Sequence, residues 1–310
     1  MTPSSLKLDL HQTPRVAQLQ SLFEERHRLS SGLIGRAVAS FGTKWAIDFE
    51  QALGSLFTDA GLLEAAAKGY ASFAFDSMRR QKAFEVAREY PHKTYAQAAG
   101  EVYFNERHMK EEYLPGLLLS HYLWPHHYRQ LQFFDTAFVG AMGVSPENHF
   151  AEVGVGTAVY SHRILTKLPT STGAAFDISP SSCRFAEDQV RAAGAQARYT
   201  MHRQDIIAQP ITPVPWLVCV EVLEHLEHPV EFLGPCGPAL RLAERRSSPR
   251  RSTPLTRITS TSTAAARRSG NTCTPPGSTW SSSLSRLPMP HRARTRPFRW
   301  LPPSSSTEAA

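Results

Sequence analysis

This 310-residue sequence lacks long apolar runs and paired cysteines. No stretch of 18 or more consecutive residues is apolar, so we expect neither a membrane-spanning helix nor a membrane partner. The four cysteines, Cys183, Cys219, Cys236 and Cys273, form no C-x-x-C pair, which argues against a disulfide framework and against a cysteine zinc site. The first fifteen residues also lack the apolar core of a signal peptide. We therefore expect a cytoplasmic protein.

Lysine and acidic residues are nearly missing from residues 234–310. This segment has 13 Arg, no Lys, no Asp and two Glu, which gives it a charge of +11. Because the whole chain carries +7, residues 1–233 carry −4. A nucleic-acid-binding domain is expected to gather its basic residues on its folded part. The charge balance therefore argues against a nucleic-acid partner.

Residues 1–143 have the pattern of an all-α domain. Apolar residues recur at three- and four-residue spacing over 62–90, which predicts a helix that ends before Pro91. A second helical stretch is expected from Tyr95, and a third from Pro115 to residue 142, broken at Pro125. The histidines and aromatic residues of 121–134 indicate either a pocket wall or ordinary helix packing.

Residues 144–233 alternate short strands and helices. Strands are expected at 149–155, 173–178, 197–206 and 216–222, and helices at 160–168, 179–194 and 223–233. This alternation predicts an α/β fold with a parallel, doubly wound sheet, which binds its ligand at the carboxyl ends of the strands.

A glycine turn follows the first expected strand. The segment Glu152-Val-Gly154-Val-Gly156-Thr-Ala158 has the small residues that let a backbone bend sharply against a ligand, ahead of a helix whose first N–H groups are free. Tight strand–helix turns also use glycine without any ligand. The turn therefore needs support from a second signal.

Acidic residues at the ends of later strands supply that support. Asp177 follows Gly156 by 21 residues, where a carboxylate can accept hydrogen bonds from two ribose hydroxyls. Its alternative role is at a helix N-terminus beside Ser179. Asp205 ends the third expected strand and is placed to hold an adenine amino group.

Together with residues 221–226 (E-V-L-E-H-L), these segments resemble, in order and spacing, the motifs of class I S-adenosylmethionine-dependent methyltransferases. The resemblance covers about 85 residues and departs from the family at Ala158, where glycine is usual. It implies a Rossmann-like domain that binds S-adenosyl-L-methionine. By this resemblance, the methionine part of the cofactor lies against Glu152, Gly154 and Gly156. The ribose and adenine lie against Asp177 and Asp205, with Ile178, Ile206 and Glu221 as further cofactor-binding residues.

Two other ligands remain as alternatives. A nicotinamide cofactor is disfavoured because the turn lacks the third glycine of G-x-G-x-x-G. A divalent metal is the second alternative, because Glu221, Glu224 and His225 would share one face if they lay on a helix. Some methyltransferases bind metal through such a string, and many relatives carry it without metal. We predict no metal site.

The predicted activity is methyl transfer to a small organic acceptor. The resemblance favours an oxygen, a hydroxyl or carboxylate of a secondary metabolite, and His225 and His127 are the candidate catalytic bases. His121 and His126 are further candidates for that role. An RNA or protein methyltransferase and a catalytically dead binding protein on the same fold remain alternatives, and a homodimer stays open.

The sequence from residue 234 onward has no sustained helical or strand period. Three further strands are expected after the fourth, yet this segment is rich in Ser, Arg, Pro and Thr. A shifted frame permits a Pro-Gly-Gly turn across residues 239–249, as this family would have there. We interpret residues 234–310 as the disordered product of a single-base reading-frame error, with a genuine basic tail as the alternative. The chain as written is then expected to be unstable or inactive.

Overall fold

The computed structural model describes residues 12–88, 97, 100–226 and 232. These residues lie within one compact unit of the chain. The predictions for the helix start at Tyr95 and for residues 234–310, including the reading-frame error, fall outside the described residues. Within the described part, no helix combines the length and apolarity that crossing a membrane requires.

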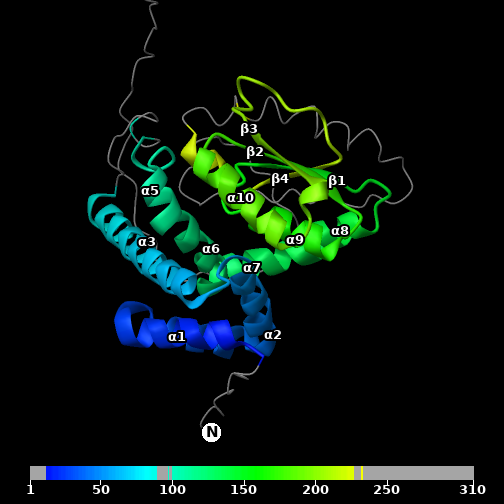
Figure 1. The fold of residues 1–310 in the computed structure, drawn as a ribbon. Coiled ribbons are helices and arrows are strands. Elements are labelled where there is room, and N and C mark those ends of the chain that lie inside the picture. The colour runs from blue at the N-terminus through cyan, green and yellow to red at the C-terminus, as the bar shows by residue number, and fades with distance from the viewer. Residues whose placement is uncertain (1–11, 89–96, 98–99, 227–231, 233–310) are drawn as a thin grey trace, which may run out of the picture. The chain divides into compact units, whose positions relative to one another are not determined.

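Long helices make up the first part of the chain, as predicted (Figure 1). Asp59 begins one of them by accepting a hydrogen bond from the backbone N–H of Leu62, and the expected break falls at Trp124, just before Pro125. The helical elements are α1 (Pro14–Arg26), η1 (Arg28–Ser30), α2 (Leu33–Leu56), α3 (Ala60–Ala87), α5 (Glu106–His108), η2 (Met109–Tyr113), α6 (Leu114–Leu123), α7 (Pro125–Phe133), η3 (Phe134–Val139) and α8 (Gly140–Gly143).

The second part contains a parallel four-stranded sheet in the order β3-β2-β1-β4. This order confirms the predicted Rossmann-like α/β arrangement, because β2 and β3 follow on one side of the central β1 and the chain then crosses back to place β4 on its other side. The elements are β1 (His149–Val153), α9 (Val159–Lys167), β2 (Thr172–Asp177), α10 (Pro180–Ala192), η4 (Gln196–Arg198), β3 (Tyr199–Arg203), β4 (Trp216–Cys219) and η5 (Leu223–His225).

The two faces of the sheet are covered differently. Phe150 faces α9 and α10 and belongs to a large hydrophobic core that continues into the helical part through Trp45 and Phe134. Ala151 and Val153 face the opposite side, where a smaller cluster includes Ile206, Val214 and Phe232. A helix is predicted at 223–233. Of these residues, 223–225 form the short turn η5 and Phe232 is helical, while residues 227–231 and 233 lie outside the description.

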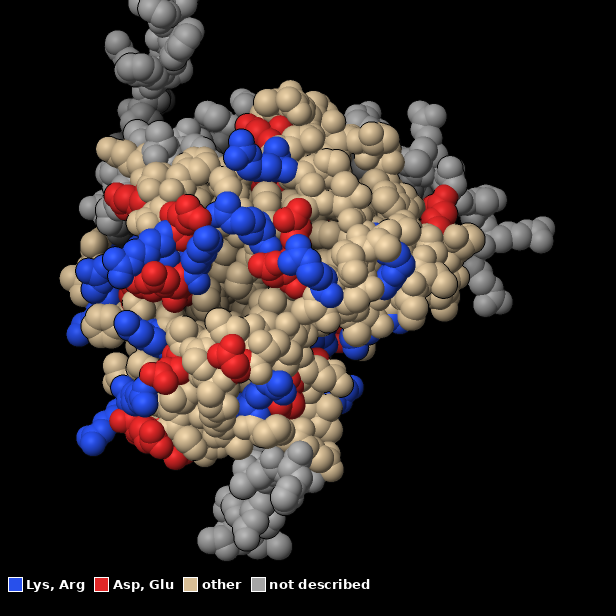
Figure 2. Space-filling view, viewed as in Figure 1, with Lys and Arg blue, Asp and Glu red and all other residues tan. Residues whose placement is uncertain are grey.

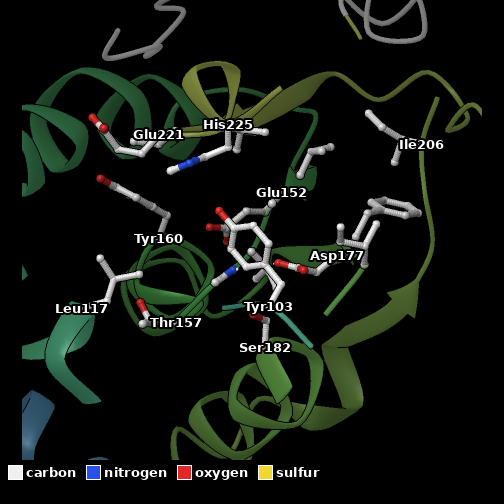
Figure 3. Close-up of a pocket in the computed structure, with 18 of the residues that line it drawn as sticks. Tyr103, Leu117, Glu152, Thr157, Tyr160, Asp177, Ser182, Ile206, Glu221 and His225 are labelled. Carbon is white, nitrogen blue, oxygen red and sulfur yellow. Dashed lines mark hydrogen bonds between the residues drawn. The ribbon is translucent and has the colours of Figure 1, made fainter. Parts of the chain in front are cut away.

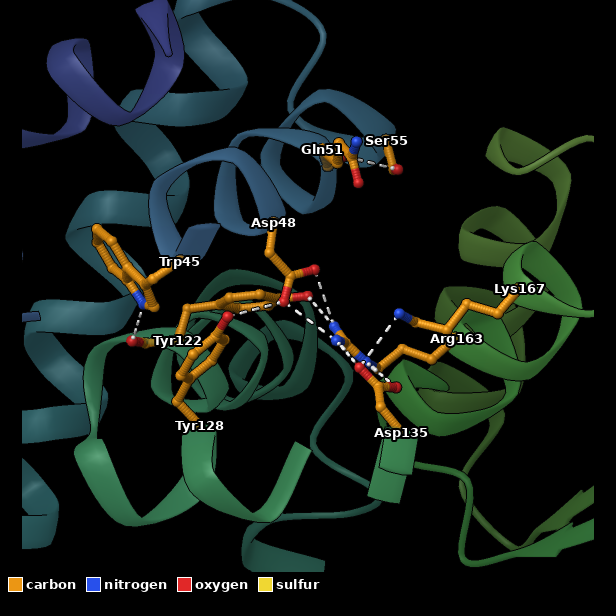
Figure 4. Close-up of polar contacts among 9 residues, drawn as sticks. All are labelled: Trp45, Asp48, Gln51, Ser55, Tyr122, Tyr128, Asp135, Arg163 and Lys167. Carbon is orange, nitrogen blue, oxygen red and sulfur yellow. Dashed lines mark hydrogen bonds and ion pairs between the residues drawn. The ribbon is translucent and has the colours of Figure 1, made fainter. Parts of the chain in front are cut away.

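A buried ion cluster joins α9 to the helical part (Figure 4). Arg163 is 5% exposed and donates hydrogen bonds to the carboxylates of Asp48 in α2 and Asp135 in η3, and to the Tyr122 hydroxyl. Lys167 also pairs with Asp135, at 3.2 Å. Because one guanidinium satisfies carboxylates from two helices, the cluster fixes α9, and the turn before it, against the helical part.

Surface charges of both signs alternate on the face of the molecule drawn in Figure 2. Several pair along a helix at three- or four-residue spacing, including Asp76 with Arg79 and Arg80, and Glu106 with Lys110.

Candidate functional site

The glycine turn after β1 has a backbone that requires its small residues. Gly154, Gly156 and Ala158 have φ values of 68°, 49° and 56°, in the left-handed region. A Cβ atom on Gly154 would also lie 2.4 Å from Cγ2 of Val222. Glycine is therefore needed at Gly154 for both its backbone conformation and its close packing.

Asp177 lies directly beside this turn. Its Oδ2 accepts a hydrogen bond from the backbone N–H of Gly156 at 3.1 Å, and its Oδ1 accepts one from Ser179 at 2.8 Å. Burial raises the pKa of Asp177, and the backbone N–H groups of Ser179, Gly156 and Ile178 oppose that rise. The carboxylate has about four acceptor sites in total, so it retains capacity for a hydrogen bond from a ligand.

Glu152 is buried, with 2% of its surface exposed. Its Oε2 accepts hydrogen bonds from the Ser161 backbone N–H, at 2.9 Å, and from the Ser161 hydroxyl. Burial raises the pKa of Glu152 to about 8, although the hydrogen bonds from Ser161 act in the opposite direction. The free site therefore holds this carboxyl largely protonated at neutral pH.

A cavity of about 420 Å³ opens at the carboxyl ends of the strands, as predicted for the ligand. Its walls come from the turn after β1, the ends of β2, β3 and β4, and the helical part through α6 and α7. Figure 3 draws Tyr160, Leu117 and Glu221 on one side of the pocket, with Asp177 and Ile206 on the other.

The structure brings all the site residues predicted from sequence to this cavity. They are Glu152, Gly154, Gly156, Asp177, Ile178, Asp205, Ile206, Glu221, His127 and His225. Asp205 lies two residues beyond β3, exposed, and its Oδ1 accepts a hydrogen bond from the Ile207 backbone N–H at 2.9 Å. Of the other two histidines considered, His121 lines the cavity and His126 lies outside its lining.

The charges of the described cavity wall have one sign. Glu152, Asp177, Asp205 and Glu221 carry carboxyl groups, of which that of Glu152 is largely protonated at neutral pH, and no Lys or Arg belongs to the lining. Such a wall favours cationic ligands and opposes phosphates.

His121 and His127 lie together between α6 and α7, with ring centroids 5.4 Å apart. Burial lowers the pKa of His121 to about 3 and that of His127 to about 4, and neighbouring positive charge adds to both shifts. Both imidazoles are therefore neutral at physiological pH. His127 in addition lies within hydrogen-bond distance of the Ser120 hydroxyl, 3.1 Å from its Nδ1.

The helical geometry assumed for a metal site at Glu221, Glu224 and His225 is wrong. Glu221 has a φ of 53° and precedes η5, a 3₁₀ turn, so these residues do not share the face of an α-helix. No group of three His, Cys, Asp or Glu residues among those described is arranged to hold a metal ion. The Glu224 side chain itself lies outside the description.

Several cavity residues carried no signal that we used in the sequence. Tyr103, Tyr113, Leu117, Thr157 and Tyr160 line the wall, but their sequence neighbours do not mark them as ligand-facing. Thr157 could have been found, because it lies inside the glycine turn. The others come together only through packing of the helical part on the sheet.

Neither a protein-family model nor a curated protein sequence matches the chain. Among solved structures it is similar to an O-methyltransferase family protein from Burkholderia thailandensis, at 14% identity and a TM-score of 0.43, over 74% of this chain and 73% of that one. It is also similar to the cyclase SpnF, at 14% identity and a TM-score of 0.32, over 38% of this chain and 42% of that one. The N-methyltransferase NodS from Bradyrhizobium japonicum WM9, in complex with S-adenosyl-L-homocysteine, matches at 16% identity and a TM-score of 0.30, over 38% of this chain and 60% of that one. The chain thus spans less than two thirds of the last two proteins. Because all three TM-scores are below 0.5, the function has to be inferred from this chain's own site.

Proposed function

We propose that this protein binds S-adenosyl-L-methionine in the cavity and transfers its methyl group to a small organic acceptor. One observation carries the proposal: the turn after Glu152 and the carboxylate of Asp177 lie side by side, joined by the hydrogen bond from Gly156. They form one wall of a cavity at the carboxyl ends of a parallel sheet. In this arrangement one ligand can contact both groups at once.

The cofactor fits the residues that are present. The Asp177 carboxylate faces the cavity and retains acceptor capacity for a ribose hydroxyl beside its hydrogen bonds from Gly156 and Ser179. Asp205 and Ile206, beyond β3, would hold the adenine, with Ile178 beside the ribose. Glu152, Gly154 and Gly156 would contact the methionine part, and Glu221 would lie near it on the opposite wall.

Charge favours this cofactor over a dinucleotide. S-adenosyl-L-methionine carries a sulfonium and an ammonium, and both are stabilised by the carboxylates of the wall. A cation beside Glu152 favours the ionised form of this carboxyl, so its pKa falls from about 8 on binding. The two phosphates of a nicotinamide dinucleotide would instead face carboxylates without any Lys or Arg among the lining residues.

The bound cofactor supplies an activated methyl group for direct displacement by the acceptor. The role of the chain is then mainly alignment and exclusion of water. The buried turn holds the donor side, while α6 and α7 form the wall on which an acceptor can rest. The acceptor atom is proposed to be an oxygen of a secondary metabolite.

The proton of a hydroxyl acceptor has two proposed destinations. His225 lines the cavity in an exposed position, with its ring centroid 6.2 Å from that of Tyr103. His127 is a weak base, because a pKa of about 4 gives its imidazole little affinity for a proton. We therefore place His225 ahead of His127.

Binding of S-adenosyl-L-homocysteine to the purified 310-residue chain tests the proposal by calorimetry. We expect wild type to bind, Asp177→Ala to weaken binding at least tenfold, and NAD⁺ not to bind. The control is Asp188→Ala, which changes an exposed aspartate on α10 paired with Arg191. Binding that is insensitive to Asp177→Ala would contradict the proposal.

A catalytically dead binding protein is the second candidate, favoured by the interpretation of residues 234–310 as a frameshifted segment. This candidate retains binding of S-adenosyl-L-homocysteine but transfers no methyl group. Methyl transfer by the purified 310-residue chain would exclude it, and would also contradict the expectation that the chain as written is inactive.

A further inference from the structure

Three buried polar atoms in the cavity wall have no hydrogen-bond partner within the described part of the chain. They are Nδ1 of His121, the hydroxyl of Tyr160 and Oγ1 of Thr157. Their residues are 6%, 5% and 1% exposed. Buried polar groups in native proteins are nearly always paired, so three such atoms on one cavity indicate that a ligand or water supplies their partners.

The side-chain rings of His121 and Tyr160 contact each other. Their centroids are 5.9 Å apart in an edge-to-face arrangement, and Phe134 packs edge-on against Tyr160 at 4.8 Å. Leu117 and Thr157 lie on the same side of the pocket as Tyr160 in Figure 3, away from Asp177 and Ile206. We call the group of Leu117, His121, Thr157 and Tyr160 the neutral subsite.

The groups of the neutral subsite are uncharged at physiological pH. Burial lowers the pKa of His121 to about 3 and raises that of Tyr160 above its ordinary value. On the cavity wall, the ionisable groups that act on Tyr160 are the carboxyls of Glu152 and Glu221. Arg163 also acts on Tyr160 and His121, but it lies outside the cavity lining and is paired with Asp48 and Asp135. An anionic acceptor would gain no ion pair there and would be repelled by Glu221. An apolar ring fits against Leu117 and the rings of His121 and Tyr160.

We propose that the neutral subsite binds the methyl acceptor, and that this acceptor is an uncharged phenol. The phenol oxygen accepts a hydrogen bond from the Tyr160 hydroxyl, and its O–H donates to Nδ1 of His121. Thr157 contributes a second hydroxyl at the side nearest the glycine turn. The inference deepens the proposed function and rests on it, because the opposite side of the cavity is assigned there to the cofactor.

Small probes with one ring and different charges test this inference. Saturation-transfer NMR would measure binding of phenol, benzoate and benzylammonium to the 310-residue chain in the presence of S-adenosyl-L-homocysteine. We expect phenol to bind at least tenfold more tightly than benzoate, and more tightly than benzylammonium. Equal or tighter binding of benzoate or of benzylammonium, or no binding of phenol, would overturn the proposal.

Tyr160→Phe removes one hydroxyl while keeping the ring that packs on Phe134. We expect it to weaken phenol binding five- to tenfold and to leave the affinity for S-adenosyl-L-homocysteine within twofold. Tyr199→Phe is the matched control, because its hydroxyl is also buried but Tyr199 lies outside the cavity lining. Equal effects of the two variants on phenol binding would overturn the subsite and indicate that water satisfies Tyr160.

The two readouts separate this inference from the proposed function. If wild type does not bind S-adenosyl-L-homocysteine but binds phenol, and Tyr160→Phe weakens phenol binding, the proposed cofactor is contradicted and the phenol subsite is kept. If wild type binds S-adenosyl-L-homocysteine but does not prefer phenol over benzoate and benzylammonium, only the proposed acceptor class is contradicted.

Discussion

Two buried ionisable side chains, Arg163 in helix α9 and Glu152 beside it, differ in the partners that surround them. Arg163, in the helix, contacts two carboxylates and a tyrosine hydroxyl (Figure 4). Glu152, in β1, accepts hydrogen bonds from Ser161 in the same helix as Arg163. It has no cationic partner among the described residues that line its cavity. Both residues are at most 5% exposed. The difference therefore comes from the partners and not from depth.

The paired Arg163 supports the fold, whereas the unpaired Glu152 faces the ligand cavity. Burial alone would lower the pKa of Arg163, but its hydrogen bonds and the charges of Asp135 and Asp48 raise it, so its charge is permanent. Burial raises the pKa of Glu152 to about 8, and the Ser161 hydrogen bonds do not offset this. A buried group left without its counter-charge is typical of a functional site, because the ligand can supply that charge.

The largest expected effect follows removal of the paired charge. Arg163→Met leaves Asp48, with a side chain 22% exposed, without a cation, and leaves Asp135, 17% exposed, paired only with the half-exposed Lys167. We expect a loss of about 3–5 kcal/mol in the free energy of unfolding, because an uncompensated buried charge is costly. Urea denaturation at pH 7 measures it. A loss below about 1 kcal/mol would mean that this cluster does not support the fold.

Replacing Glu152, which has no counter-charge among the described cavity residues, is expected to stabilise the protein at high pH, whereas replacing Arg163 destabilises it. The folded-state pKa of Glu152, about 8, is above its unfolded value of about 4.5, so the folded state binds the extra proton between these values. Stability from this group is present at low pH and is lost as pH rises toward 8. Between pH 6 and 8, wild type should lose about 2 kcal/mol relative to Glu152→Gln. Urea titrations of both proteins at the two pH values measure it, and parallel pH profiles would contradict the assignment.

The same substitution should weaken ligand binding. Because the carboxyl of Glu152 is mostly protonated in the free protein at pH 7, a cationic ligand releases a proton when it binds. Calorimetry with S-adenosyl-L-methionine in phosphate and in Tris should give different heats for wild type. Glu152→Gln should remove most of that difference and reduce affinity about tenfold, equivalent to about 1.4 kcal/mol. A buffer dependence that survives in the variant would assign the proton to another group.

The smallest effect is expected at the edge of the paired cluster. Lys167 contacts Asp135 at 3.2 Å, but its side chain is 45% exposed. Lys167→Met should change the free energy of unfolding by less than about 1 kcal/mol, since solvent screens such pairs. It also serves as the matched control for Arg163→Met in the same urea experiments. A loss as large as that of Arg163→Met would show that the cluster acts as one unit.

The cofactor side of the cavity was predictable because its signals are local in sequence. Gly154 and Gly156 lie within one short turn, and Asp177 ends the next strand, so spacing alone predicts their proximity. Their roles toward a cofactor remain predictions. The parallel sheet was predictable from the alternation of strands and helices, and the structure confirms it.

The remainder depends on contacts that sequence spacing does not encode. Arg163 meets Asp48 across 115 positions, and Tyr160 meets His121 only because α9 packs on the helical part. The alternation of strands and helices predicts a helix at 223–233, of which the structure describes the beginning and Phe232. The left-handed backbone of Glu221 instead leads into a 3₁₀ turn, which no residue type there indicates.

The backbone conformation and burial of Ala158 limit which residues can occupy position 158. It precedes α9 with a φ of 56° and no exposed surface. A branched or longer side chain would combine an unfavourable backbone region with a steric overlap in the interior. Only alanine and glycine satisfy both conditions, so natural variants of this protein should alternate between these two amino acids at position 158.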